Sequence, residues 1–235
     1  MNRWPCIDPS IKEQAAYVFV DVETFGLDYQ CDPVVELGIR VTDKYLKDVT
    51  RKTWLILPED LEDAWRSSSD FIKEMHTKSG LIDDLRVLPK EGYTIDDVDH
   101  PDYGRYANYS ANFQSYDAWR WLTESLDLEP GKMPMCGSSV HFDRSMIESQ
   151  LLVLHGFFSH RNIDVSTVKE LCRRWNPALY SRISKDPMCQ KENQKHRPQE
   201  DLDGTIHELQ FYFDNFFQVE MNDEAEGQFQ LPVTL

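Results

Sequence analysis

The sequence lacks the features that would place the protein in a membrane or outside the cell. No uninterrupted apolar run approaches the length of about 18 residues that a membrane helix needs. The first residues, Met1 to Pro5, lead into no apolar segment of the kind found in secretory signals. The five cysteines are odd in number and widely scattered, with no C-x-x-C pair. We therefore expect reduced thiols in a cytoplasmic protein without a membrane partner.

Positive charge is also scarce. Lysine and arginine number 25 against 41 aspartate and glutamate residues, so the formal net charge is −16 at pH 7. Such a charge disfavours the binding of long nucleic acids through general attraction to their phosphates. A nucleic-acid function would therefore need metal ions and a confined pocket.

Apolar residues make up 40% of the 235 residues, which is enough for one sizeable core. We expect a single domain over residues 1–219 and a flexible acidic tail at 220–235. Two stretches show no helical or strand period that would predict a regular element. We interpret 86–112, rich in tyrosine and acids, as a surface insertion, and 176–195 as a mobile connector.

The apolar run Tyr17-Val18-Phe19-Val20 predicts a strand that continues through Asp21-Val22-Glu23-Thr24. In a strand, residues i and i+2 point to the same face, so Asp21 and Glu23 would present their carboxylates side by side. That arrangement suits a divalent cation. A D-x-E pair alone is weak evidence, because acids at strand ends are often only solvated turn formers.

Further elements follow from composition and period. Predicted strands lie at 33–41, 53–57, 133–136 and 162–165. The strands at 33–41 and 53–57 would form an antiparallel meander with the strand at 17–24. Predicted helices lie at 70–80, at 113–126, after the Gly137-Ser138-Ser139 turn, from Ser166 onward, and from Pro198 to Phe216. This order places Asp143 in the first turn of one helix. It also places His196 and Asp201 at the start of the last helix.

Five short motifs occur in one order over residues 17–217: D-V-E-T-F-G-L-D, H-T-K-S-G-L, C-G-S-S-V-H-F-D-R, D-V-S-T-V-K-E-L-C-R-R-W and H-R-P-Q-E-D. Each motif is weak alone, but together they resemble the DEDDh group of 3′→5′ exonucleases, and within it most closely the oligoribonucleases. The resemblance implies an α/β fold of the ribonuclease H-like type, with a mixed five-stranded sheet flanked by helices. It also implies hydrolysis of short single-stranded RNA to nucleoside 5′-monophosphates.

By the same resemblance, two Mg²⁺ or Mn²⁺ ions would be held by Asp21, Glu23, Asp143 and Asp201, with His196 as the general base. These residue types fit the chemistry. Hard cations prefer carboxylate oxygens, and two of them roughly 4 Å apart can stabilise the attacking and leaving oxygens of a phosphodiester. An imidazole titrates near neutral pH and can accept a proton from water.

The resemblance further implies substrate contacts from residues on several elements: a base wedge at Leu27, a stacking ring at Phe71, a pocket residue at His76, a phosphate contact at Ser139, and a 5′-phosphate cap of Arg161 and Ser166. Arg161 would come from the partner subunit of a homodimer. Phe71 and His160 stand where the family usually has tryptophan and tyrosine, and both changes weaken stacking.

Two other readings of the pattern stay open from the sequence. One is a general single-strand DNA exonuclease of the same fold, because all DEDDh enzymes share the metal chemistry. The other is a catalytically silent binding module. The intact acidic and histidine positions speak against the second reading, since the loss of at least one would be expected in a silent protein.

Overall fold

The computed structural model describes residues 10–94, 106–190 and 195–217. Its centre is a five-stranded sheet in the order β3-β2-β1-β6-β7. The strands are β1 (Tyr17–Thr24), β2 (Val34–Thr42), β3 (Asp48–Leu55), β6 (Met135–Gly137) and β7 (Asn162–Asp164). The first three are antiparallel, whereas β6 runs parallel to both β1 and β7. The predicted mixed five-stranded sheet is confirmed.

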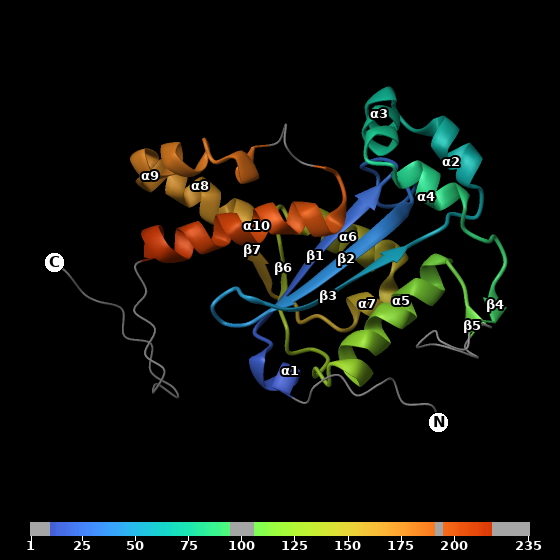
Figure 1. Cartoon of the computed structure of the whole chain (residues 1–235), viewed down its shortest axis with the longest axis horizontal. Helices are drawn as coiled ribbons and strands as arrows, with labels where there is room; N and C mark the ends of the chain where they lie inside the picture. The colour runs from blue at the N-terminus through green and yellow to red at the C-terminus, as the bar shows by residue number, and fades with distance from the viewer. Residues whose placement is uncertain (1–9, 95–105, 191–194, 218–235) are drawn as a thin grey trace.

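Helices cover the sheet and one of its ends (Figure 1). They are α1 (Ser10–Gln14), α2 (Leu61–Ser67), α3 (Asp70–Lys78), α4 (Leu81–Arg86), α5 (Ala111–Arg120), α6 (His141–Gln150), α7 (Leu152–His155), α8 (Val165–Trp175), α9 (Pro177–Ile183) and α10 (Pro198–Tyr212). Single turns of other helix types are η1 (Trp121–Ser125), η2 (Pro187–Cys189) and η4 (Phe213–Phe217). Within the described ranges no helix has the length and hydropathy that spanning a bilayer requires.

The two faces of the sheet carry separate apolar cores because side chains alternate along each strand. Val18, Val20 and Val22 of β1 pack with α5, α6 and α7. Phe19 points to the opposite face and packs with α8, α9 and α10. A third cluster around Phe25 joins α2, α3 and α4 at the end of the sheet. The face that carries Phe19 is also the face of Asp21 and Glu23.

Two stretches predicted to be irregular are partly ordered. The connector at 176–195 contains α9 and η2, so the prediction that it has no regular element is wrong for residues 177–183 and 187–189. Asn176 caps α9 through its side chain, and Pro177 occupies the first helical position, two local signals that the mixed composition obscured. The insertion at 86–112 contains a two-residue ladder, β4 (Tyr93–Thr94) with β5 (Tyr106–Ala107). Its residues 95–105 lie outside the described residues, as does the predicted tail at 220–235.

Strand β3 begins five residues earlier than the apolar pattern indicated. It is an edge strand, and its first six residues are all exposed or half-buried. Polar residues on such a strand face water, so they leave no apolar run to detect. The described cysteines, Cys31, Cys136, Cys172 and Cys189, are all free thiols, as predicted.

Candidate active site

Strand β1 places two carboxylates on the sheet face that α10 covers. Asp21 and Glu23 follow Phe19 at two-residue spacing, so all three side chains point to this face. Asp21 pairs with Gly38 on β2. A side chain at Gly38 would place its Cβ 2.3 Å from the Cβ of Pro198, the first residue of α10. The glycine therefore lets the start of α10 lie directly against the strand pair that carries Asp21.

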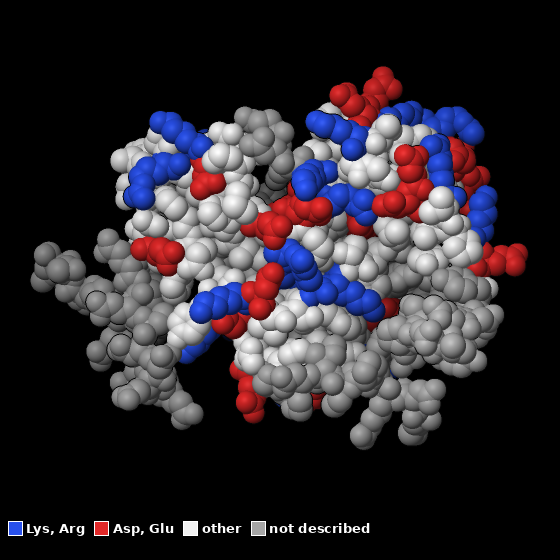
Figure 2. Space-filling model, viewed as in Figure 1, with Lys and Arg blue, Asp and Glu red and all other residues white. Residues whose placement is uncertain are grey.

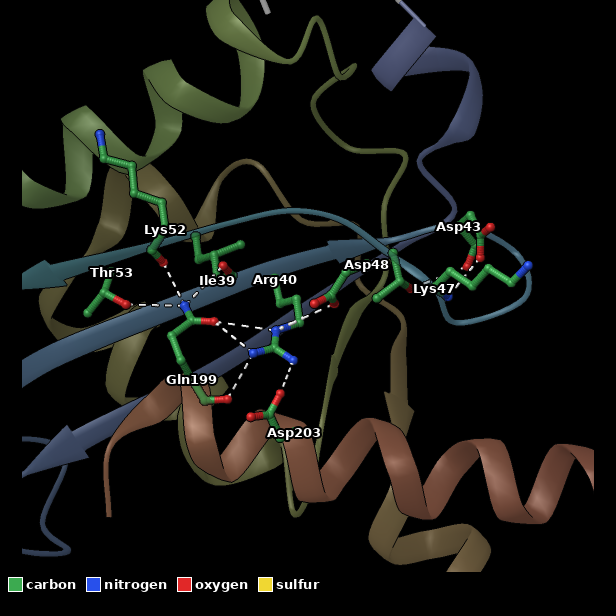
Figure 3. Close-up of polar contacts among 10 residues, drawn as sticks. Ile39, Arg40, Asp43, Lys47, Asp48, Lys52, Thr53, Gln199 and Asp203 are labelled. Atoms are coloured by element: carbon green, nitrogen blue, oxygen red, sulfur yellow. Dashed lines mark hydrogen bonds and ion pairs between the residues drawn. The ribbon is translucent and has the colours of Figure 1, made fainter. Parts of the chain in front are cut away.

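A polar network holds this end of α10 in place (Figure 3). The Gln199 amide donates to the carbonyl oxygens of Ile39 (3.3 Å) and Lys52 (3.0 Å), on β2 and β3. Arg40, which is almost fully buried, donates to the Gln199 backbone carbonyl at 3.0 Å and pairs with Asp203. These contacts join the first turn of α10 to the sheet. Asp201, within the same turn, is thereby fixed opposite β1.

The result is a compact acidic cluster. Ligand oxygens of Asp21, Glu23 and Asp201 all lie within 4.8 Å of one another. Asp143, in the first turn of α6, is buried and its Oδ1 accepts the backbone N–H of Val22 at 3.1 Å. Strand β6 pairs with β1 only at Val18 and Phe19. Further along β1, the Asp143 carboxylate accepts the Val22 N–H in place of a strand partner.

The electrostatics of the cluster show four acids that repel one another. Burial, followed by the charges of Asp143 and the other acids, holds the pKa of Asp21 well above its usual range. Burial and the charge of Asp201 do the same to the pKa of Glu23. Burial raises the pKa of Asp143 to about 7 and that of Asp201 to about 6. A bound cation would supply the positive charge that this site needs.

The donor set fits Mg²⁺ or Mn²⁺. All the candidate ligand atoms are carboxylate oxygens, which hard divalent cations prefer over nitrogen and sulfur. Among the described residues no lysine or arginine forms an ion pair with any of the four acids. The negative charge of the cluster is therefore available to cations.

His196 lies immediately before α10 and is joined to the cluster through its backbone. The N–H groups of Lys195 and His196 hydrogen-bond Asp201. His196 adopts a positive φ of 54°, a conformation that is costly for a non-glycine residue and that a tertiary contact must maintain. Its side chain lines a cavity of about 880 Å³, and burial together with the charge of Lys78 lowers the pKa of its imidazole. A neutral imidazole can accept a proton at pH 7.

Arg197 anchors this segment and was not identified from the sequence. Its guanidinium binds both carboxylate oxygens of Glu36 at 2.8 Å, and its Nη1 donates to Asp84 at 2.8 Å. Glu36 faces Glu23 across the β1–β2 ladder and is buried. The one available signal was a glutamate inside the apolar run Val34 to Leu37, which calls for a cationic partner.

The predicted phosphate-contact residues form a second group, with Ser139 on the loop after β6 and Ser166 in the first turn of α8. Asp164 accepts the backbone N–H groups of Ser139 (2.8 Å) and Ser166 (3.0 Å). The hydroxyls of Ser139 and Ser166 lie 3.0 Å apart. Ser139 also has a positive φ of 55°. The structure thus brings two predicted residues together and adds Asp164 as the group that orients both.

The remaining predicted contacts lie in two different environments. Leu27 and Phe71 are 79% and 69% exposed, and His160 and Arg161 are also exposed. His76, which we predicted to line the pocket, is fully buried instead. It lies four residues after Ile72 on the inner face of α3, and its Nε2 contacts the Thr24 carbonyl oxygen at 2.8 Å. His76 therefore supports the end of β1, and its contact with substrate stays a prediction.

Charge on the visible face of the molecule is mixed. Figure 2 shows basic and acidic side chains interspersed over the middle of this face, where β3 and the start of α10 lie in Figure 1. The cavity beside His196 includes Arg51, Lys78 and Lys195 in its lining. Positive charge is therefore available locally despite the formal net charge of −16.

No family model matches the chain. Curated proteins do match it, among them two oligoribonucleases. The oligoribonuclease of Paraburkholderia xenovorans is 30% identical over 224 residues, which cover 93% of this chain and 92% of that protein. The mitochondrial oligoribonuclease of Mus musculus is 31% identical over 224 residues, which cover 92% of this chain and 82% of that protein.

Solved structures share the fold at lower identity. They include E. coli exonuclease I in a zinc-bound complex with single-stranded DNA (TM-score 0.52, 17% identity). The match covers 87% of this chain and 43% of the exonuclease I chain. They also include S. pombe Pop2p with Mg²⁺ and Mn²⁺ (TM-score 0.54, 14% identity), with 91% of this chain and 89% of that one covered. The sheet and its flanking helices therefore have the ribonuclease H-like fold. On the strength of the curated relatives, the chain belongs to the oligoribonuclease family, within the DEDDh superfamily of 3′→5′ exonucleases.

Proposed function

We propose that the protein hydrolyses short single-stranded RNA to nucleoside 5′-monophosphates with two divalent cations, Mg²⁺ or Mn²⁺, held by Asp21, Glu23, Asp143 and Asp201. The observation that carries the proposal is the cluster of carboxylate oxygens from β1 and α10 within 4.8 Å. Such a pair of cations, when bound, supplies positive charge to the attacking and leaving oxygens of a phosphodiester.

His196 takes the proton from the attacking water in this proposal. Two features support the role. The lowered pKa keeps the imidazole neutral near pH 7, and the hydrogen bonds from its own and the preceding N–H to Asp201 tie its position to a cation ligand. Arg197 positions the same segment through the buried Glu36. These contacts fix the backbone of His196 relative to Asp201.

The substrate would enter past exposed apolar groups and end at the serine pair. Leu27 and Phe71 present apolar surface on which a base can stack. Ser139 and Ser166 offer hydroxyls 3.0 Å apart for a phosphate, with Arg161 of the partner subunit of a homodimer as a charged cap. A cap of this kind favours very short strands because a longer strand collides with it. A cytoplasmic location is part of the same proposal.

The test is a time course on end-labelled RNA and DNA of two to about twenty nucleotides, with Mg²⁺, Mn²⁺ or a chelator. We expect monophosphate release from the 3′ end of short RNA, loss of activity with chelator, and loss of activity in Asp201→Asn. Asp127→Asn is the matched control, because Asp127 is an exposed acid with a positive φ that asparagine also adopts. Asp201→Asn activity equal to that of the control would refute the site.

The partner's contribution has its own test. A mixture of inactive Asp21→Asn and inactive Arg161→Met proteins forms mixed dimers in which one site has both residues intact. We expect activity to return on mixing if Arg161 acts across the dimer. If activity does not return although both variants are dimeric in sedimentation, Arg161 either acts within its own chain or does not cap the substrate.

A further inference from the structure

A second cluster of metal-ligand side chains lies where the segment before His196 packs on α10. It consists of Asp186, Cys189 and His207, whose ligand atoms all lie within 4.8 Å of one another. All three residues are partly buried. They come from η2 and its N-cap on one side and from the second half of α10 on the other. None of them belongs to the acidic cluster described above.

The local fold explains how the first two ligands meet. Asp186 caps η2, with its Oδ1 accepting the Met188 N–H at 3.0 Å. Residues at i and i+3 eclipse in a 3₁₀ turn, so Cys189 stands on the same side as Asp186. The Cys189 N–H also donates to the Asp186 carbonyl oxygen at 3.0 Å. The sequence Asp186-Pro187-Met188-Cys189 therefore presents a carboxylate and a thiol in one turn.

A glycine brings the third ligand into range. A Cβ at Gly204 on α10 would lie 2.7 Å from the Met188 carbonyl oxygen, so only glycine allows η2 to approach this closely. His207 is three residues further along α10, close to one turn. Its Nε2 contacts Asp186 Oδ2 at 2.9 Å. The Oδ1 of Asp186 accepts the Met188 N–H, and Oδ2 is the oxygen that faces His207.

We propose that Asp186, Cys189 and His207 form a zinc site that fastens the segment before His196 to α10. A thiolate, an imidazole and a carboxylate together match the ligand preferences of Zn²⁺, whereas Mg²⁺ prefers oxygen ligands alone. Tetrahedral zinc places neighbouring donor atoms about 3.3 to 3.7 Å apart. The ligand atoms, which lie within 4.8 Å of one another, would need to approach by up to about 1.5 Å, whereas the 2.9 Å separation of His207 Nε2 and Asp186 Oδ2 would lengthen slightly. A water molecule takes the fourth position, and the Cys189 thiol releases its proton to solvent when the metal binds.

Cobalt substitution tests the site without interference from the acidic cluster. Co²⁺ bound to a thiolate gives a sulfur-to-metal charge-transfer band in the near ultraviolet, and the carboxylates around Asp21 contain no sulfur to produce it. We expect the full-length protein, with excess Mg²⁺ present, to develop this band with one Co²⁺ per chain and to lose it when Zn²⁺ is added. Cys189→Ser should abolish the band and His207→Gln should weaken it.

The matched control is Cys31→Ser, which removes an exposed free thiol and should leave the band unchanged. Thermal unfolding gives a second measure that does not depend on colour. One equivalent of Zn²⁺ should raise the melting temperature of the parent and of Cys31→Ser but not that of Cys189→Ser. No band in the parent, or a band that survives Cys189→Ser, would overturn the proposal. So would an equal Zn²⁺-dependent shift in Cys189→Ser.

Discussion

Replacing Arg197 with methionine should destabilise the protein far more than an ordinary surface substitution does. The change removes the cation that binds both oxygens of Glu36 at 2.8 Å. The Glu36 side chain is only 2% exposed, so its carboxylate would be left buried and unpaired. Breaking a buried ion pair from one side costs about 3–5 kcal/mol.

We place the cost for Arg197→Met near the lower end of this range, at about 3 kcal/mol at pH 8. The Arg197 side chain is 24% exposed, and its other partner, Asp84, is 48% exposed, so the second ion pair contributes little. For a chain of this size about 3 kcal/mol corresponds to a fall in melting temperature of about 6 to 12 °C.

The cost should depend on pH. Burial outweighs the ion pair at Glu36 and leaves the pKa of this carboxyl raised even with Arg197 present. Removing Arg197 takes away the two interactions that lower this pKa, so it rises further. A carboxyl whose pKa is raised in the folded state destabilises the fold at high pH. This penalty shrinks as pH falls below the folded-state pKa and vanishes below the pKa of the unfolded state. Arg197→Met should therefore be less destabilised at pH 5 than at pH 8.

The assay is urea unfolding of metal-free protein at both pH values, with a second-site variant and a control. Adding Glu36→Leu to Arg197→Met removes the stranded carboxylate and should recover most of the lost stability. Arg66→Met breaks an exposed pair with Asp63 and should have no measurable effect. If Arg197→Met is no less stable than Arg66→Met, or if adding Glu36→Leu increases the loss of stability, the Arg197–Glu36 pair does not stabilise the fold as predicted.

Three further predictions concern the acids, the imidazole and the packing of α10. Since burial raises the pKa of Asp143 to about 7 and that of Asp201 to about 6, the metal-free protein should lose stability between about pH 5 and pH 7.5, and Mn²⁺ should raise its melting temperature more at pH 7.5. Lys78→Gln removes a charge that lowers the pKa of His196, so the acidic limb of kcat/KM should move to higher pH. Gly38→Ala should displace α10 and weaken both activity and Mn²⁺ binding.

Each of these predictions has its own control. A melting temperature of chelated protein that rises from pH 5 to pH 7.5 would contradict the first. Lys132→Gln, which changes an exposed lysine, should leave the kcat/KM profile in place, and an equal shift in both lysine variants would contradict the second. Gly156→Ala adds a Cβ at ordinary contact distance and should preserve activity. Equal activity of the two glycine variants would contradict the third.

The residue pattern was sufficient for most of the strands and for the acids of β1, whereas the mixed five-stranded sheet was expected from the family resemblance. An apolar run that ends in alternating carboxylates fixes both the strand and the face of its side chains, so Asp21 and Glu23 could be paired by period alone. Asp201 could be predicted only through the family resemblance. Its position depends on Gly38 and on the Arg40–Gln199 network, which join residues about 160 positions apart.

The buried supports of the site could not be predicted for a related reason. Arg197 and Glu36 are polar residues whose partners lie on other elements, and local composition says nothing about which elements meet. For His76, the family motif identified the residue but not its burial against the Thr24 carbonyl oxygen. Helix α9 escaped detection because its capping residues lie within a stretch whose overall composition is that of a loop.

We propose that four acids from β1, α6 and α10 bind a pair of cations. The most direct measurement is calorimetric or paramagnetic counting of Mn²⁺ bound to the parent, to Asp201→Asn and to Asp127→Asn. We predict two Mn²⁺ per chain in the parent and in Asp127→Asn, and loss of at least one ion in Asp201→Asn. Equal Mn²⁺ binding by all three proteins, or none by the parent, would contradict the claim.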